Sequence, residues 1–419
     1  MQGVNAAMGR STAVDFSFAD FKQLGNKVLL KLDALREAAP IFWSDLNRCW
    51  IVTGHTEVVE GFSGRLPLAA RRHELVASFF ADPVERAQSI GFLLEVYGDF
   101  LSNTDPPEQL RLRKLMMTAF SKKVSESYRP FVRQVVKEAL DAIEGEDAID
   151  FADRIARQVT ARVILHVVGL DQGLMSDMKR WAYLLNDGLS GNPDKAAIIA
   201  ADRALREMRD CFLPVIERRR DAPTEDFTSA LLTAREGEDR LSDTELVAQL
   251  ILILVAGHDT TLNTTSLAVA KLAELPEARD YMRAHPENFE GCAMELMRIV
   301  AMSTSMGRIA SEDFEWGGHQ IKQGQFVTLM IAAANRDPSV FAEPERLDFE
   351  RSQAGNMTFA PGRHFCVGHF FAKMVISEIL PAFMERYASW DLLEDEIEFS
   401  ASLNFRGPLH TNIRLHPAA

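Results

Sequence analysis

The stretch FAPGRHFCVG, residues 359–368, places one cysteine in a loop that is dense in glycine, aromatic and basic residues. The other cysteines, at positions 49, 211 and 292, are distant in sequence, so Cys366 has no neighbour with which to build a zinc ribbon or a disulfide framework. A thiolate that binds a metal needs N–H donors and a dry surrounding, because otherwise it protonates or oxidises. A buried structural cysteine in a turn is the alternative interpretation.

The residues around Cys366 favour the metal-ligand interpretation. Gly362 and Gly368 allow the backbone to approach closely on either side of the sulfur, and Phe359 can shield it from water. His364 can reach a nearby anion. The pattern after Cys366 becomes helical, which places the sulfur near a helix N-terminus, where negative charge is favoured. The full spacing F-x-x-G-x-H-x-C-x-G is the specific signal, because a C-x-G alone is weak.

Composition limits the function classes. The chain has 419 residues, 47% apolar content and a net charge of −14, so binding to a nucleic-acid backbone is not expected. The N-terminus lacks an apolar targeting segment, and the most apolar run, 250–256, is far shorter than the ~20 residues that span a bilayer. We therefore expect no membrane attachment, and the unpaired cysteines fit a reducing, cytoplasmic setting.

Helical periodicity dominates the chain. Segment 242–275 is the longest and begins with a capping box formed by Ser242 and Glu245; at 1.5 Å per residue it would extend over about 50 Å, through the interior. Shorter alternating runs predict strands at 312–331, 409–415 and around 50–52. We predict a mainly α fold with a minor β region, forming one domain over residues 1–419. The further helices are predicted at 105–120 (with Asp105 as N-cap), 126–146, 151–169, 173–190 and 194–220.

The sequence AGHDTT, residues 256–261, interrupts the apolar middle of the longest predicted helix. It places an acid, Asp259, beside a hydroxyl, Thr260. Gly257 costs about 1 kcal/mol relative to alanine in a helix, which makes sense if something must approach the backbone closely. Two alternatives stay open: Thr260 can bond back to the Ala256 carbonyl, and Asp259 can lie on a solvated face.

Glu295 and Arg298 lie three positions apart in CAMELMRIV and therefore share a helix face. An exposed ion pair of little value is the default for such a pair, but the apolar neighbours make partial burial plausible. The segment 335–351 that follows later is rich in proline and turn residues, and it predicts an irregular loop.

In this order, the four features resemble the cytochrome P450 family of haem-thiolate monooxygenases over nearly the whole chain. The resemblance implies haem b, with Cys366 as the axial ligand of the iron and with Ala256 and Gly257 beside the distal face. It implies that Glu295 and Arg298 are structural and pair with an arginine of the following loop. Arg346 and Arg351 are the candidates, and the pattern favours Arg346.

The same resemblance assigns the haem propionates to Arg113, Arg308 and His364. The family's soluble bacterial members usually have histidine four positions before the arginine at 113, where this chain has Gln109. Gln109 can donate a neutral hydrogen bond but brings no charge. The family also tends to carry glutamate nine residues after the cysteine, where this chain has Val375.

The implied reaction inserts one oxygen atom from O2 into a C–H or C=C bond of a small hydrophobic substrate. Asp259 and Thr260 would deliver protons as catalytic residues. Electrons would come from an iron–sulfur ferredoxin and its reductase. The sequence favours equally two interpretations of its nearby basic residues, a docking patch or a mere scatter of surface charge; these residues are Arg111, Lys114, Arg363 and Lys373. Pocket residues are expected at Leu252, Val255, Ala256, Ser303, Thr304 and Phe405, with 79–103 as a mobile substrate loop.

Three alternatives compete with this hypothesis. One is a peroxide-driven haem-thiolate peroxygenase, against which the acid–alcohol pair at 259–260 argues. Another is a non-catalytic haem-binding sensor, which would need an output module. The last is a helical binding protein without cofactor, in which Cys366 merely packs.

Overall fold

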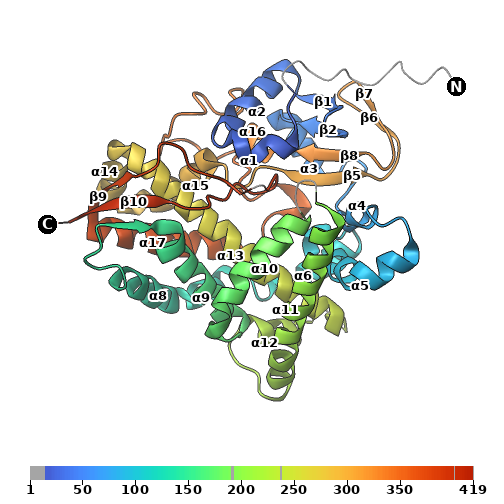
Figure 1. Ribbon diagram of the computed structural model, residues 1–419, viewed down its shortest axis with the longest axis horizontal. Coiled ribbons are helices and arrows are strands. Elements are labelled where there is room, and N and C mark those ends of the chain that lie inside the picture. Colours follow the sequence, from blue (N-terminus) through green and yellow to red (C-terminus); the bar gives the residue numbers. More distant parts are fainter. Residues whose placement is uncertain (1–14, 190–192, 236–237, 401, 419) are drawn as a thin grey trace.

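A computed structural model describes residues 15–189, 193–235, 238–400 and 402–418. The N-terminal stretch 1–14, considered above for a targeting segment, lies outside the described residues. Helices make up most of the described chain, as the periodicity predicts (Figure 1). The first helices of the chain are α1 (Phe21–Leu24), α2 (Lys27–Ala38), α3 (His55–Ser63) and α4 (His73–Ala77). The short helix α16 (Ile331–Ala334) packs against α2 and α3.

The predicted long helix is α13, Asp243–Glu274, which runs through the middle of the molecule (Figure 1). Its capping box is present, since the Ser242 side chain accepts from the Glu245 amide and the Glu245 carboxylate accepts from the Ser242 amide. By length and composition α13 could cross a membrane, but 61% of its most apolar window is buried inside the protein. That burial identifies a core helix.

The other helices pack around α13, and the largest hydrophobic cluster lies between them. The four helices predicted between 126 and 220 are confirmed as α8, a short π-helix joined to α9, α10 and α11. Their bounds, with those of the remaining helices, are α5 (Pro83–Asp99), α6 (Glu108–Met117), α7 (Lys122–Ser127), α8 (Arg129–Asp141), the π-helix Ala152–Ala156, α9 (Arg157–Val168), α10 (Met175–Leu189), α11 (Lys195–Asp221), α12 (Phe227–Thr233), α14 (Pro276–Ala284), α15 (Phe289–Val300) and α17 (His369–Arg386).

The minor β region forms small sheets. One has the strand order β1-β2-β8-β5-β3, in which β2 and β8 are parallel and the other pairs antiparallel. A second has the order β4-β10-β9, and β6 and β7 form a hairpin around Gly317 and Gly318, which both have positive φ. The strands are β1 (Ile41–Ser44), β2 (Cys49–Val52), β3 (Leu68–Ala69), β4 (Ala148–Asp150), β5 (Met306–Ala310), β6 (Phe314–Trp316), β7 (His319–Ile321), β8 (Phe326–Leu329), β9 (Tyr387–Leu392) and β10 (Asn412–Pro417).

Two local predictions are wrong. Asp105 does not cap α6, which starts only at Glu108, after a cis peptide bond between Pro106 and Pro107. The Asp105 carboxylate instead accepts the Ala70 amide at 3.0 Å, so it ties α6 to the chain beyond β3. The expected loop at 79–103 is mostly helix, because α5 fills it, with one non-helical residue at Ile90.

Candidate active site

The Cys366 loop is a tight turn closed by the backbone. The Cys366 amide donates to the Phe359 carbonyl at 2.9 Å. Gly362 has φ of +76°, and a Cβ atom there would lie 2.5 Å from the Phe62 carbonyl oxygen of α3. This position therefore requires glycine, as the sequence suggested. The loop leads directly into α17, so the sulfur lies near a helix N-terminus.

The surroundings of the Cys366 thiol act on its pKa in opposite directions. Burial raises the pKa of the thiol, while the Gly368 backbone N–H and the nearby Arg113 guanidinium lower it. Gly368 acts here through its N–H, because a Cβ atom at this position would make only ordinary contact, 3.9 Å from a Phe120 carbon. The net effect of the protein alone is a raised pKa, so a metal ion bound to the sulfur would be needed to hold Cys366 as a thiolate.

Helix α6 binds the Cys366 loop through side-chain hydrogen bonds. Gln109 donates from Nε2 to the Arg363 carbonyl at 2.8 Å, and Arg113 donates from Nη1 to the Phe365 carbonyl at 2.8 Å. The Gln109 side chain is fully buried, and its Oε1 atom has no hydrogen-bond partner among the described residues. Both residues therefore reach the loop that carries Cys366, and their predicted contact with a propionate stays a prediction.

Basic side chains gather around His364 of this loop. Burial lowers the pKa of His364 to about 3, and the positive charges of Arg308, Arg72, Arg363 and Arg113 add to this effect. Burial also lowers the pKa of Arg308 to about 9. Its Nη1 atom donates only to the Gly307 carbonyl. Among the described residues these four arginines form no ion pair with a carboxylate, so the cluster has unused donors for an anion.

This donor set fits haem. The group carries two carboxylates and a metal that accepts a thiolate. Arginines without carboxylate partners, of which Arg308 is buried and the others are partly exposed, supply what such carboxylates require. Arg72 was missed by sequence reasoning. It lies far from Cys366 in the chain and sits in a stretch, PLAARRHEL, with no recognisable motif.

The acid–alcohol pair lies on α13. The Asp259 side chain is 30% exposed, and burial raises its pKa to about 6 against the effect of Arg157. Thr260 donates from Oγ1 to the Ala256 carbonyl at 2.6 Å, which is the back-bonding alternative considered above. At 30% exposure the Asp259 side chain is only partly solvated, which disfavours the solvated-face alternative.

Gly257 has a structural explanation on the α9 side of the helix. A Cβ atom at Gly257 would lie 2.7 Å from Cδ1 of Ile164, so glycine allows α9 to pack closely on α13. The close approach that the sequence predicted is therefore made by a protein side chain. A contact of Gly257 or Ala256 with the cofactor remains a prediction.

The expected substrate residues come from two places. Ser303 and Phe405 form an isolated antiparallel bridge, and the Thr304 amide donates to the Asn404 carbonyl at 2.9 Å. Thr304 is fully buried, and its hydroxyl has no partner among the described residues. The structure thus brings the 303–304 segment and the chain near 405 together. The other three expected residues share α13, namely Leu252, Val255 and Ala256.

Glu295 and Arg298 form a fully buried pair with 2.8 Å between Oε1 and Nη2. The prediction of Arg346 as its partner is wrong. Arg346 points outward and pairs with Glu343 at 3.1 Å, both side chains being more than half exposed. Arg351 instead donates from Nε to Oε1 of Glu295 at 3.0 Å. Arg346 offers only its backbone carbonyl to this network.

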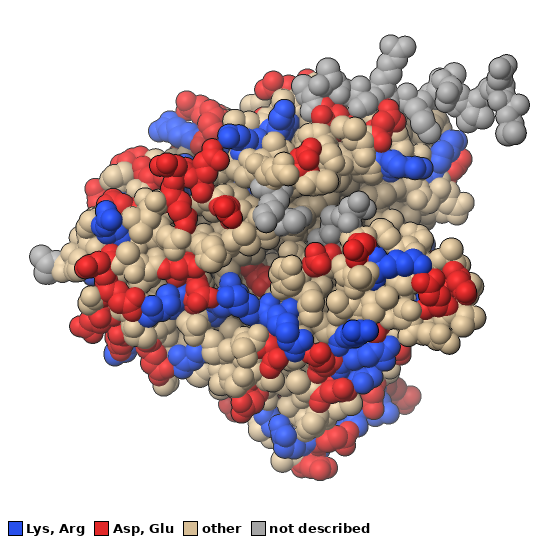
Figure 2. All heavy atoms as spheres, viewed as in Figure 1, with Lys and Arg blue, Asp and Glu red and all other residues tan. Residues whose placement is uncertain are grey.

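The residues considered either as a docking patch or as a scatter of surface charge are mostly held in contacts with other residues, which favours the second interpretation. Arg111 pairs with Glu108, with Glu245 and, at 3.1 Å, with Asp239. Lys373 pairs with Glu290, Lys114 is engaged as well, and Arg363 donates to the Gly64 carbonyl. On the face in Figure 2, acidic and basic side chains are likewise interspersed.

Comparison with known proteins agrees with this geometry. Residues 77–402 match the model of the family described as Cytochrome P450. The chain belongs to the cytochrome P450 family. It is 31% identical over 390 residues to 6-deoxyerythronolide B hydroxylase of Saccharopolyspora erythraea, covering 91% of this chain and 94% of that one.

Solved P450 structures share the fold. The structure of P450BioI in complex with an acyl carrier protein ligated to hexadec-9Z-enoic acid has a TM-score of 0.86 at 25% identity, covering 95% of this chain and 100% of that chain. Epothilone D-bound P450epoK has a TM-score of 0.85 at 26% identity, with coverages of 96% and 100%. This P450 is therefore a haem-dependent monooxygenase that uses O2, a substrate and a redox partner.

Proposed function

We propose that this P450 binds haem b through Cys366 and hydroxylates, or epoxidises, a bulky and mainly apolar substrate with electrons from an iron–sulfur ferredoxin. The single observation that carries this proposal is the pairing of a closed thiolate loop with the acid–alcohol pair of α13, a helix that packs against α17. We propose further that the chain acts as one domain in the cytoplasm.

Bound haem supplies the oxygen-activating chemistry at its iron. The chain's own residues hold and tune that group. Cys366 ligates the metal, its charge being moderated by the Gly368 N–H and by Arg113. Arg72, Arg308 and His364 hold the propionates, and Gln109 and Arg113 fix the loop that carries the sulfur. Arg308 stacks on the Phe62 ring, 5.1 Å from its centroid, which orients its guanidinium.

Asp259 and Thr260 of α13 would deliver the protons that the reaction consumes. The pKa of the Asp259 carboxyl lies near 6, so this group exchanges a proton close to neutral pH, as a proton donor must. The Thr260 hydroxyl holds its own proton in a bond to Ala256 and can turn to donate it elsewhere. The peroxygenase alternative needs no net supply of protons, since hydrogen peroxide already carries the two protons of the water that is released. A pair that delivers protons from outside therefore favours the monooxygenase.

The substrate class follows from the apolar surfaces of α13 and from the relatives. Leu252, Val255 and Ala256 present aliphatic surface, and Phe405 adds an aromatic ring beside Ser303. The similar proteins act on 6-deoxyerythronolide B or bind epothilone D or an acylated carrier protein, by their names. A large apolar compound with few polar groups is therefore the substrate class that we propose.

Lys122 and Lys123 replace the predicted ferredoxin-docking residues. Both are exposed at the start of α7, and among the described residues neither forms an ion pair. Helix α7 packs against α17, the helix that starts after Cys366. Exchange of both lysines for glutamate should weaken reduction by an acidic ferredoxin and reduce its salt dependence. Lys31→Glu on α2, an exposed lysine of the N-terminal side, is the matched control.

The decisive experiment for the reaction is isotope incorporation. The haem-loaded enzyme is given a library substrate that changes the ferric spin state, a ferredoxin, its reductase, NADH and 18O2. One labelled oxygen atom in the product confirms the monooxygenase. Equal turnover with hydrogen peroxide alone would favour the peroxygenase, and failure of every spin-state ligand to turn over would favour the sensor.

A further inference from the structure

His258 lies between the acid–alcohol pair and helix α9, and the proposed mechanism gives it no role. Its side chain is almost fully buried on α13. Its Nδ1 atom lies 3.0 Å from Oγ1 of Thr160, and its Nε2 atom lies 3.7 Å from Oδ1 of Asp259. The imidazole therefore connects the Asp259 carboxyl with a hydroxyl of the neighbouring helix.

The hydrogen bonds fix the tautomer of this imidazole. Oγ1 of Thr160 contacts both the Ala156 carbonyl oxygen, at 2.8 Å, and the imidazole. Because the carbonyl can only accept, both contacts are hydrogen bonds only when the hydroxyl proton points to that carbonyl. Oγ1 of Thr160 is then free to accept, and His258 donates to it from Nδ1. In consequence Nε2 carries a lone pair, and among the described residues it has no hydrogen-bond partner.

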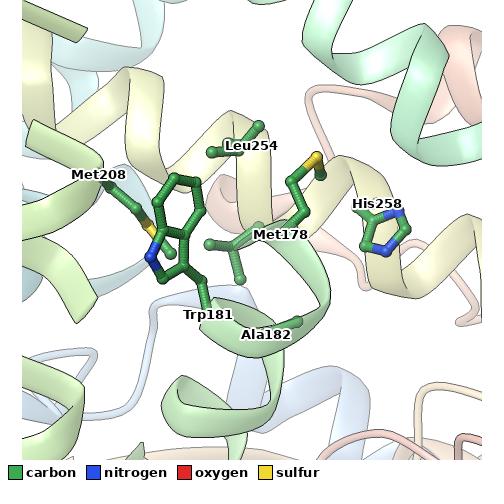
Figure 3. Close-up of a pocket in the computed structure, with 7 residues that line it drawn as sticks. Met178, Trp181, Ala182, Met208, Leu254 and His258 are labelled. Carbon is green, nitrogen blue, oxygen red and sulfur yellow. The ribbon is translucent and has the colours of Figure 1, made fainter. Parts of the chain in front are cut away.

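Among the described residues, Asp259 is the candidate hydrogen-bond partner for Nε2 of His258. A cavity of about 10 Å³ beside His258 is close to the minimum for one water molecule. Figure 3 shows its lining, which otherwise consists of Met178, Trp181 and Ala182 from α10, Met208 from α11 and apolar residues of α13. The Trp181 N–H already donates to Glu207. A water there would lack the further polar partners that it needs, so the cavity does not satisfy Nε2.

An imidazole lone pair and an ionised carboxylate repel each other at 3.7 Å, whereas a protonated carboxyl can donate to that lone pair. The proposed hydrogen bond requires a rotation of the Asp259 side chain that shortens this separation to hydrogen-bond length. The charged group acting on both residues is Arg157 of α9, which pairs with Asp153 at 3.1 Å. The faces of α10 and α11 that line the cavity are apolar.

We propose that His258, held in one tautomer by Thr160, accepts a hydrogen bond from protonated Asp259 and so acts as a positioning residue that keeps a proton ready beside Thr260. This inference rests on the proposed role of Asp259 as proton donor. No covalent bond to the ring is made or broken: the proton stays on Oδ1 of Asp259, hydrogen-bonded to Nε2, and Asp259 is the group that donates it. Burial lowers the pKa of His258 to about 3, which keeps the ring a neutral acceptor.

The experiment measures the proton itself by infrared difference spectroscopy of the haem-loaded, substrate-free enzyme over a pH series. The C=O band of protonated Asp259 is the one lost in Asp259→Asn. In His258→Phe the carboxyl loses its acceptor, so we expect this band to shift to higher frequency. In Thr160→Val the ring is free to adopt the other tautomer and donate to the carboxylate, so we expect the pH midpoint of the band to fall.

Two controls separate this role from packing. Thr160→Ser keeps the hydroxyl and should retain the parent midpoint, and Met178→Leu alters the same cavity without a polar change and should retain the parent band. An unchanged band in His258→Phe, or an unchanged midpoint in Thr160→Val, would overturn the proposal. Because no turnover is measured, failure of the monooxygenase assay is distinguished from failure of this inference.

Discussion

Arg351 donates from Nε to the Glu295 carboxylate at 3.0 Å, across 56 positions of the chain, while Arg346 remains outside at the surface. Glu295 is fully buried and also binds Arg298 through both oxygens. The carboxylate thus joins α15 to the irregular segment that precedes the Cys366 loop. This network fixes the path of the chain into the loop that carries Cys366.

We expect Arg351→Ala to lower the free energy of unfolding by about 2 kcal/mol, because a buried carboxylate loses a charged donor. Haem should also be released more readily, since the preceding segment is no longer anchored. Urea unfolding followed by circular dichroism and by the haem absorption measures both effects. Arg346→Ala should stay within about 0.5 kcal/mol of the parent. Equal effects of the two variants would contradict the assignment of Arg351.

The second prediction concerns Gly362, where the backbone has φ of +76° and the Phe62 carbonyl leaves no room for a Cβ atom. Gly362→Ala should destabilise the protein by about 3 kcal/mol or more, since strain and overlap add. Gly91→Ala is the control, because no atom lies within 4 Å of its Cβ position in α5. That control should be neutral or stabilising by about 0.5–1 kcal/mol. Thermal unfolding of the two holoproteins tests the difference.

The third prediction tests the thiolate. Cys366→Ser should lose the absorption spectrum typical of sulfur-ligated haem in the reduced, CO-treated protein, and its haem content should fall. Cys211→Ser is the matched control, because Cys211 is a partly exposed free cysteine on α11. Spectra and pyridine haemochrome content of both variants supply the measurement. A parent-like spectrum in the Cys366 variant would show that another residue binds the iron.

Much of this architecture could be predicted from sequence because its signals are local. The capping box of Ser242 and Glu245, the apolar run behind it and the Cys366 spacing each lie within one short window. The helix at 83–99 also has a local signal, an aspartate N-cap at 82 followed by Pro83 at the first helical position.

The remaining errors involve contacts between distant segments, which periodicity does not encode. Arg346 and Arg351 stand in the same irregular loop, and only the folded path decides which one reaches Glu295. Arg72 reaches the haem-binding cluster by the same kind of long-range packing. Asp105 was misassigned because the Ala70 amide, 35 positions earlier, competes for its carboxylate.

The fourth prediction concerns pH. The pKa of Asp259 is about 6 in the folded protein against an ordinary value of 3.8, so the folded state binds this proton more tightly than the unfolded state. The favourable contribution is present below the ordinary value and is lost as the pH rises through about 6. Asp259→Asn should therefore stabilise the protein by about 2 kcal/mol at neutral pH and by progressively less below pH 6. Urea titrations of both proteins across this pH range measure their free energies of unfolding. A difference between the two free energies that stays constant with pH would refute the assignment.

The last prediction separates the chemical role of Thr260 from its bond to the helix. Thr260→Ala should uncouple NADH consumption from product formation, because the hydroxyl beside Asp259 is lost while the substrate pocket is kept. Thr265 makes the same kind of bond on the same helix, from Oγ1 to the Thr261 carbonyl at 2.7 Å, but has no acid beside it. Thr265→Ala should therefore keep the parent ratio of product to NADH. If both variants lost coupling equally, the effect would come from the helix and not from proton delivery.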